Sequence, residues 1–80
     1  MVTHEKIDKT LDCIGLFCPI PLLQTRTALD EIEIGQTLEV FSDDPASESD
    51  IKSLVKRTGQ VLVKFEDNDG EFHFLIKRIK

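Results

Sequence analysis

Strand-like segments alternate with two segments of helical spacing, and this order constrains the fold more than any other feature of the sequence. Strands are expected at residues 7–13, 37–41, 61–65 and 72–76. In these ranges apolar residues occupy alternate positions over much of the length, as in a strand with one buried face. Residues 67–70 have the composition of a turn, so the last two strands are expected to form a hairpin. The expected order is β-α-β-α-β-β.

Each helix is expected to begin at a proline and to end at a glycine. Proline is favoured at the first helical position, which assigns that position to Pro19 in the first helix and to Pro45 in the second. Asp44 is the expected N-cap residue of the second helix. Gly35 and Gly59 are suited to the left-handed conformation just past a helix end. The predicted buried faces comprise Leu22, Leu23, Ala28, Leu29 and Ile32 in the first helix and Ile51, Leu54 and Val55 in the second.

This order defines an α+β fold, a two-layer α/β sandwich with a four-stranded mixed sheet. Right-handed β-α-β crossovers place both helices on one face of the sheet and leave the other face open. A chain of 80 residues allows one domain, residues 1–80. The hairpin residues predicted to face the helices are Val61, Val63, Phe65, Phe72, Phe74 and Ile76. Leu62, Leu75 and Ile79 would then face outward, either as a dimer or partner surface or as ordinary exposed residues.

The net charge of −5 is concentrated in one stretch. Residues 30–50 carry eight carboxylates and neither Lys nor Arg. Such a chain lacks the basic clusters that neutralise phosphates, so direct nucleic-acid binding is not expected. The acidic stretch would either attract a basic protein partner or simply solvate one edge of the fold. Because the sequence shows neither a long apolar run nor a secretory signal, we expect a soluble, cytoplasmic protein without membrane association.

Two cysteines, Cys13 and Cys18, are too few for a disulfide framework, and free thiols are expected. The sequence has no Cys-x-x-Cys, so neither a thioredoxin-like site nor a zinc site is indicated. His4 near the terminus and His73 in mid-strand do not suggest a Cys–His nucleophilic pair, and both are interpreted as surface residues. No glycine loop of the phosphate-binding kind is present either. We therefore expect neither a metal nor a cofactor.

Cys18 has the most distinctive surroundings, in the segment Gly-Leu-Phe-Cys-Pro-Ile-Pro. At the start of a helix, unpaired N–H groups and the helix dipole favour a thiolate, which is the reactive form of cysteine. Pro19 and Pro21 stiffen this turn but lack N–H groups. The remaining donors are chiefly those of Ile20 and Leu22. The residues alone leave open whether Cys18 is reactive or buried and inert, but a reactive sulfur without acid–base partners suits a carrier that other proteins load and unload.

Residues 11–23, Leu-Asp-Cys-Ile-Gly-Leu-Phe-Cys-Pro-Ile-Pro-Leu-Leu, closely resemble the N-terminal signature of the TusA (SirA-like) sulfur-carrier family. That signature is Leu-Asp-x-x-Gly-Leu-x-Cys-Pro-x-Pro. Residues 43–46, Asp-Asp-Pro-Ala, followed by Asp-Ile at 50–51, are similar to the family's segment after the second strand. The resemblance extends over about residues 9–79. It implies a fold related to the C-terminal domain of translation initiation factor three.

The resemblance further implies that Cys18 is the catalytic residue, the acceptor of a persulfide. A cysteine desulfurase or a rhodanese would donate sulfane sulfur to it, and a downstream acceptor protein would take it off, as in tRNA thiolation, sulfur oxidation or cofactor supply. The activity would be that of a sulfurtransferase-like carrier acting with partner enzymes. The sequence identifies neither the donor nor the acceptor, nor whether the cargo is sulfur or selenium.

The sequence departs from the tRNA-thiolation type at two positions beside Cys18. Phe17 stands where that type has an arginine, and Ile20 stands where it has a glutamate. The sulfur is therefore flanked by apolar side chains, which leaves open the partners that dock there. Arg26 matches a basic position of that type and either serves recognition or pairs with Asp30, four residues along the same helix.

The other signature residues are expected to support the site. Asp12 would anchor the loop by side-chain hydrogen bonds, and Gly15 would supply backbone freedom. Pro19 and Pro21 belong to the signature as well. Asp43 and Asp44 are expected to cap the second helix, with partner docking as the alternative.

Two other functions stay open at this stage. Cys13 either fills the core or serves as a resolving thiol that closes a disulfide with Cys18, which would make a redox switch. Alternatively, the chain is a non-catalytic regulatory or protein-interaction module that binds through its acidic stretch and open sheet face. The expected oligomeric state is a monomer or a weak homodimer.

Overall fold

The computed structural model describes residues 6–80. Its elements are β1 (Lys9–Cys13), α1 (Ile20–Glu31), β2 (Thr37–Ser42), α2 (Ser47–Thr58), β3 (Val61–Asn68) and β4 (Glu71–Lys77), which confirms the predicted order. β3 and β4 are longer than predicted because the hairpin turn is confined to Asp69 and Gly70. Both turn residues have positive φ, and such turns match the right-handed twist of the strands that they join.

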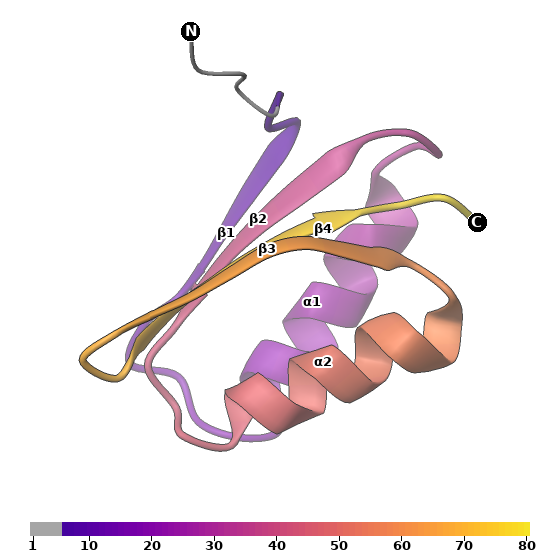
Figure 1. The fold of residues 1–80 in the computed structure, drawn as a ribbon. Coiled ribbons are helices and arrows are strands. Elements are labelled where there is room, and N and C mark those ends of the chain that lie inside the picture. Colours follow the sequence, from indigo (N-terminus) through magenta and orange to yellow (C-terminus); the bar gives the residue numbers. More distant parts are fainter. Residues whose placement is uncertain (1–5) are drawn as a thin grey trace, which may run out of the picture.

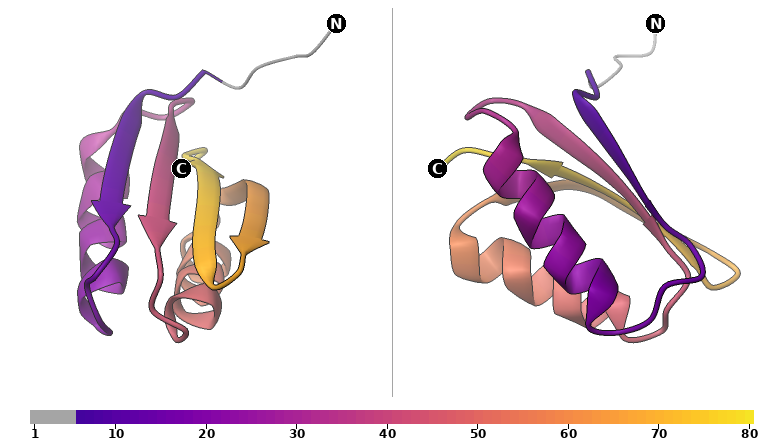
Figure 2. Two further views of the ribbon diagram at one scale, coloured as in Figure 1. Left: turned by 90° about the vertical axis from the view of Figure 1, so that its left-hand side faces the viewer. Right: turned by 180° about the vertical axis from the view of Figure 1, so that it is seen from behind.

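The strands form one mixed sheet in the order β1-β2-β4-β3. β1 and β2 are parallel, whereas β4 is antiparallel to both β2 and β3. Both helices cover the same face of the sheet and the other face is open (Figures 1 and 2). The fold is therefore the predicted two-layer α+β sandwich, in which β4 lies between β2 and β3.

The core lies between the sheet and the two helices. The side chains with no measurable exposure include Cys13 from β1, Leu38 and Val40 from β2, Ile51 from α2, and Phe74 and Ile76 from β4. Burial of a large apolar side chain contributes about 1.5–3 kcal/mol relative to exposure. In a chain of this size few such side chains are available, so each core position carries a large share of the stability.

The predicted orientation of β3 is wrong for Val61, Leu62 and Val63 and right for Phe65. Val61 and Val63 are 41% and 37% exposed, whereas Leu62 and Phe65 pack against the core. A β-bulge between Leu62 and Lys64 shifts the register of β3 against β4. An extra residue reverses the alternation of side chains beyond it, so a strict period of two assigns this strand to the wrong faces.

The helix boundaries also differ from the prediction. α1 ends at Glu31, and Gly35, with a φ of 94°, belongs to the turn that leads into β2. Pro19 is the N-cap residue of α1 rather than its first residue, while Pro21 falls in the first turn. α2 begins at Ser47, after the Asp-Pro-Ala segment that was expected to start it.

The buried face of α1 differs from the prediction at Leu23. Pro21, Thr25, Ala28 and Leu29 are buried, whereas Leu23, predicted to be buried, is 50% exposed. α2 ends as predicted at Gly59, whose φ of 76° is left-handed. In the described part of the chain, neither helix has the length and apolar character needed to cross a membrane.

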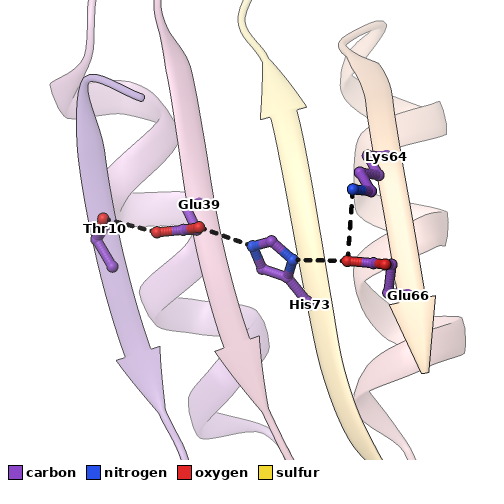
Figure 3. Close-up of polar contacts among 5 residues, drawn as sticks. All are labelled: Thr10, Glu39, Lys64, Glu66 and His73. Carbon is purple, nitrogen blue, oxygen red and sulfur yellow. Dashed lines mark hydrogen bonds and ion pairs between the residues drawn. The ribbon is translucent and has the colours of Figure 1, made fainter. Parts of the chain in front are cut away.

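A row of polar side chains crosses the open face of the sheet (Figure 3). Thr10 donates from Oγ1 to Oε1 of Glu39 at 3.0 Å, and Oε2 of Glu39 lies 2.8 Å from Nε2 of His73. On the other side of the ring, Nδ1 of His73 lies 3.4 Å from Oε1 of Glu66, which pairs with Lys64. These contacts join all four strands through side chains as well as through the backbone.

Leu62, Leu75 and Ile79 do not form an apolar patch on the open face, which was one of the two alternatives left open for them. Leu75 lies on this face, opposite Glu39 on β2 and Lys64 on β3, but it is only 7% exposed. Leu62 packs toward the core instead, and Ile79 lies beyond the end of β4. The outward apolar residues therefore do not form one surface.

Candidate functional site

Two loops at one end of the sheet bring most of the predicted site residues together. Because β1 and β2 are parallel, the loops that follow them, residues 14–19 and 43–46, leave the sheet at the same end. Each loop leads into the start of a helix, and Figure 1 shows both of them below the sheet. Cys18 lies near the end of the first loop, facing the first turn of α2.

Asp43 and Asp44 hold the first loop instead of capping α2. Oδ1 of Asp43 accepts the N–H of Gly15 at 2.9 Å, and Oδ2 of Asp44 accepts the N–H of Cys18 at 2.7 Å. Asp44 also receives a 3.3 Å bond from the N–H of Ala46, the N-cap residue, but no side chain caps the helix itself. The capping prediction is wrong because the two carboxylates find their shortest partners in the other loop.

Asp12 and Gly15 shape the backbone between β1 and Cys18. Oδ1 of Asp12 accepts the N–H of Ile14 at 3.0 Å, which closes a local turn at the end of β1. Gly15 has a φ of 84°, a conformation in which a residue with a side chain is strained. The loop therefore reaches Cys18 through a sharp turn that this sequence is built to make.

Cys18 is exposed, so the alternative of a buried, inert thiol is wrong. Its Sγ donates a hydrogen bond to Oδ2 of Asp50 at 3.3 Å. This hydrogen bond raises the pKa of the Cys18 thiol, and partial loss of hydration and the negative charges of Asp50 and Asp44 raise it further. The direction is opposite to the one expected from the helix start.

The reversal agrees with the small number of free N–H donors at the helix start. Pro19 and Pro21 have no N–H group, and the N–H of Ile20 donates to the carbonyl oxygen of Phe17 at 2.8 Å. The N–H of Cys18 itself is taken by a carboxylate. The sulfur therefore faces negative charge, and the neutral thiol is favoured.

Exposed apolar side chains flank Cys18 in the loop and in the first turn of α1. Phe17 is 70% exposed, Ile14 is 41% exposed and Ile20 is 40% exposed. Large apolar side chains held in water next to a reactive atom are typical of a surface that a partner covers.

Arg26 lies further along α1 and points to a different part of the surface. With Leu54, Arg57 and Thr58 it lines a shallow hollow of about 300 Å³ between the two helices. Among residues 6–80 it forms no ion pair within 4.0 Å with Asp30. The role of Arg26 in recognition stays a prediction.

Cys13 is fully buried at the end of β1 and belongs to the core cluster. Its Sγ lies 3.7 Å from Oε1 of Gln24 on α1, to which it donates a weak hydrogen bond. Burial, and then the charge of Asp12, raises the pKa of the Cys13 thiol. A buried thiol that stays protonated is a poor nucleophile, which favours the core role over the resolving role.

Asp50 is the site residue that reasoning from the sequence missed. It was noted only as part of the segment at 43–51 that is similar to the family's, and no role was assigned to it, because acidic residues in the first turn of a helix commonly interact with the helix dipole. A signal was present, because both helix starts follow parallel strands and must meet at one end of the sheet.

The described residues offer no arrangement for metal chemistry and no histidine next to the sulfur. Within residues 6–80, no group of three His, Cys, Asp or Glu side chains could hold a metal ion. His73 contacts Glu39 and Glu66 on the open face, away from the helices. His4 lies outside the described residues.

The fold and the site together define a class of protein. A small α+β domain presents one exposed thiol at the start of a helix, on a loop held by carboxylates, an arrangement that suits a thiol-bearing carrier. Comparison with known proteins identifies the family. The family model of sulfurtransferase TusA matches residues 9–78, and the chain belongs to that family.

Similar proteins cover almost the whole chain. A relative from Archaeoglobus fulgidus, named as a sulfur carrier protein, is 51% identical over 73 residues, which are 90% of this chain and 95% of that protein. The sulfur carrier protein TusA of Allochromatium vinosum is 41% identical over 71 residues, 89% of this chain and 93% of the relative. The crystal structure of a SirA-like protein from Desulfitobacterium hafniense superposes with a TM-score of 0.79 at 26% identity and covers 90% of this chain and 99% of that one. These relatives support a sulfur-carrier role.

Proposed function

We propose that this protein carries sulfane sulfur as a persulfide on Cys18. The observation that carries the proposal is the exposure of Cys18 on a fixed loop in a chain whose relatives are named sulfur carrier proteins. A carrier needs an accessible sulfur in a defined position, and partner enzymes can supply the proton transfers that the described residues are not arranged to perform.

Loading is a transfer between sulfur atoms. The Cys18 thiol loses its proton to solvent, and the thiolate attacks the outer sulfur of a donor persulfide. A new S–S bond forms at Sγ of Cys18, the S–S bond of the donor breaks, and the donor thiolate leaves. No external oxidant is needed, because the transferred sulfur brings its oxidation state with it. Unloading is the same reaction in the other direction: the thiolate of an acceptor attacks the outer sulfur on Cys18, the S–S bond at Cys18 breaks, and the Cys18 thiolate leaves.

The partners follow from this chemistry. The donor is a cysteine desulfurase or a rhodanese-type protein, the acceptor is a downstream sulfur-acceptor protein, and the relay takes place in the cytoplasm. Phe17 and Ile20, exposed beside the sulfur, are the apolar contacts for docking, and Arg26 is a separate recognition point on α1. The loop that presents the sulfur is held by the remaining signature residues and the two loop carboxylates: Asp12, Gly15, Pro19, Pro21, Asp43 and Asp44.

Intact-mass analysis tests this proposal. The protein is incubated with a cysteine desulfurase, pyridoxal phosphate and L-cysteine, and its mass is measured before and after reduction. The parent protein is expected to gain the mass of one sulfur atom and to lose it on reduction, whereas Cys18→Ser gains none. Cys13→Ala is the matched control, because it removes the other thiol, and it is expected to load like the parent.

The carrier role on Cys18 is contradicted if Cys18→Ser loads as well as the parent. It is also contradicted if the parent gains no sulfur from either a desulfurase or a rhodanese that loads a related carrier in the same experiment. Loss of loading in Cys13→Ala, with the fold intact by circular dichroism, would assign the chemistry to the buried thiol instead.

A further inference from the structure

The charged groups that act on the Cys18 sulfur are all negative. Asp50 accepts the thiol hydrogen bond from the first turn of α2, and Asp44 acts on the sulfur from the loop between β2 and α2. No cationic side chain contributes among the described residues, and α1 has no acidic residue in its own first turn. The protonation of the Cys18 thiol therefore depends on the carboxylates at and just before the start of α2.

Of the two carboxylates, Asp50 is the one whose hydrogen-bond partner is the Cys18 thiol and no other group among the described contacts. Both oxygens of Asp44 already accept backbone N–H groups, from Cys18 and Ala46. Glu48, which lies in the same first turn of α2, is paired with Lys52 at 2.8 Å. Asp50 has neither a backbone donor nor an ion pair among the described contacts, and the thiol is its hydrogen-bond partner.

We propose that Asp50 is a positioning residue that holds the Cys18 sulfur as an oriented, neutral thiol in the free protein. The inference rests on the proposed role of Cys18 as the sulfur acceptor. A carboxylate 3.3 Å from the sulfur accepts the S–H hydrogen and opposes a second negative charge at the same place. The exposed thiol is thereby kept from reacting with small electrophiles and oxidants, for which the thiolate is the reactive form.

The test is the pH dependence of alkylation by iodoacetamide, an uncharged reagent. Rates are measured between about pH 6 and 10, a range that spans the ordinary thiol titration, and peptide mass spectrometry confirms that the adduct is on Cys18. In Asp50→Asn the midpoint is expected to move to lower pH, because the like charge is removed while the shape is kept. Near neutral pH the rate is expected to rise several-fold, since each unit of lowering gives about ten times more thiolate.

Glu48→Gln is the matched control. It removes the same charge from the same helix turn, but its carboxylate is held by Lys52 and does not contact the sulfur. Its midpoint is expected to stay at the parental pH. A second variant, Asp50→Ala, removes the acceptor altogether and is expected to lower the midpoint too, and circular dichroism verifies that each variant is folded.

The inference is overturned if the Asp50→Asn midpoint equals or exceeds that of the parent, or if Glu48→Gln lowers it equally. A merely structural Asp50 would change thermal stability and leave the alkylation midpoint in place. Because alkylation requires no sulfur donor, its result is independent of the loading experiment. If the parent protein loads sulfur but Asp50→Asn leaves the alkylation midpoint unchanged, only the role of Asp50 is refuted. If the midpoint shifts but the parent protein does not load sulfur, only the proposed function is refuted.

Discussion

Replacing Asp44 by alanine removes the carboxylate that links the two loops at Cys18. Asp44 is 7% exposed, and its Oδ2 receives the N–H of Cys18 at 2.7 Å. Its Oδ1 receives a longer bond, 3.3 Å, from the N–H of Ala46. Alanine cannot accept either hydrogen bond, so the Cys18 N–H loses its partner at the point where the loop enters α1.

The expected loss of stability follows from the type of bond removed. A hydrogen bond to a charged group contributes about 1.5–3 kcal/mol. With the weak bond to Ala46 included, we expect a loss of about 2–3 kcal/mol. That is a large part of the roughly 4–12 kcal/mol typical of a chain of this length.

Equilibrium unfolding in urea, followed by far-UV circular dichroism, measures this loss. The midpoint is expected to fall with an unchanged slope, since the surface exposed on unfolding is nearly the same. Thermal unfolding should show a decrease of roughly 10–20 °C in Tm, because about 1 kcal/mol shifts the Tm of a domain of this size by 4–8 °C. Asp43→Ala is the matched control, since it removes an exposed carboxylate that accepts the N–H of Gly15.

The control is expected to lose less, about 0.5–1.5 kcal/mol, because Asp43 is exposed and water can accept the N–H of Gly15 in its place. The reasoning is refuted if Asp44→Ala loses no more stability than Asp43→Ala. It is also refuted if Asp44→Ala unfolds at the parental midpoint, because the bond to Cys18 would then contribute nothing measurable to the loop.

Two further predictions concern acid stability and thiol accessibility. The hydrogen bond with His73, and then the charge of Lys64, lowers the pKa of Glu66. The ionised Glu66 side chain therefore stabilises the fold above its unfolded-state pKa, and this stabilisation is lost as the pH falls through the folded-state pKa. The Tm difference between the parent and Glu66→Gln should therefore start to shrink as the pH falls through the ordinary glutamate pKa of about 4.3 and disappear in stronger acid, as thermal unfolding at several pH values would show. Because Cys13 is buried and Cys18 exposed, iodoacetamide should label one thiol in the folded protein and two in denaturant, and equal labelling of both in the folded state would contradict the core position of Cys13.

The sequence predicts the parts of the fold that depend on local patterns. The period of two in β4 and the spacing of Ile51, Leu54 and Val55 in α2 were sufficient to give the elements and their order. The faces of β3 were not predictable, because the bulge after Leu62 depends on how β3 pairs with β4 and not on the residues of β3 alone.

The same division applies to the site. Cys18 was identified from its neighbours in the chain, since a cysteine before a proline at a helix start is a local feature. Its surroundings were not, because the Asp44 and Asp50 contacts join residues 26 and 32 positions apart. Propensity assigned Asp44 to a nearby helix end, and the tertiary contact with Cys18 prevailed over that local choice.

Under the proposed function, the arrangement of carboxylates and prolines would leave the activation of Cys18 to a partner protein. Pro19 and Pro21 remove N–H donors from the helix start, and Asp44 takes the N–H of Cys18 itself, so the loop is rigid but offers little stabilisation to a thiolate. Asp50 adds a negative charge on the exposed side. A partner that brings a cationic group against Asp50 would neutralise this charge and favour the Cys18 thiolate next to the donor persulfide. Selectivity for the correct donor then comes from the docking surface, because the free thiol is by itself a slow nucleophile.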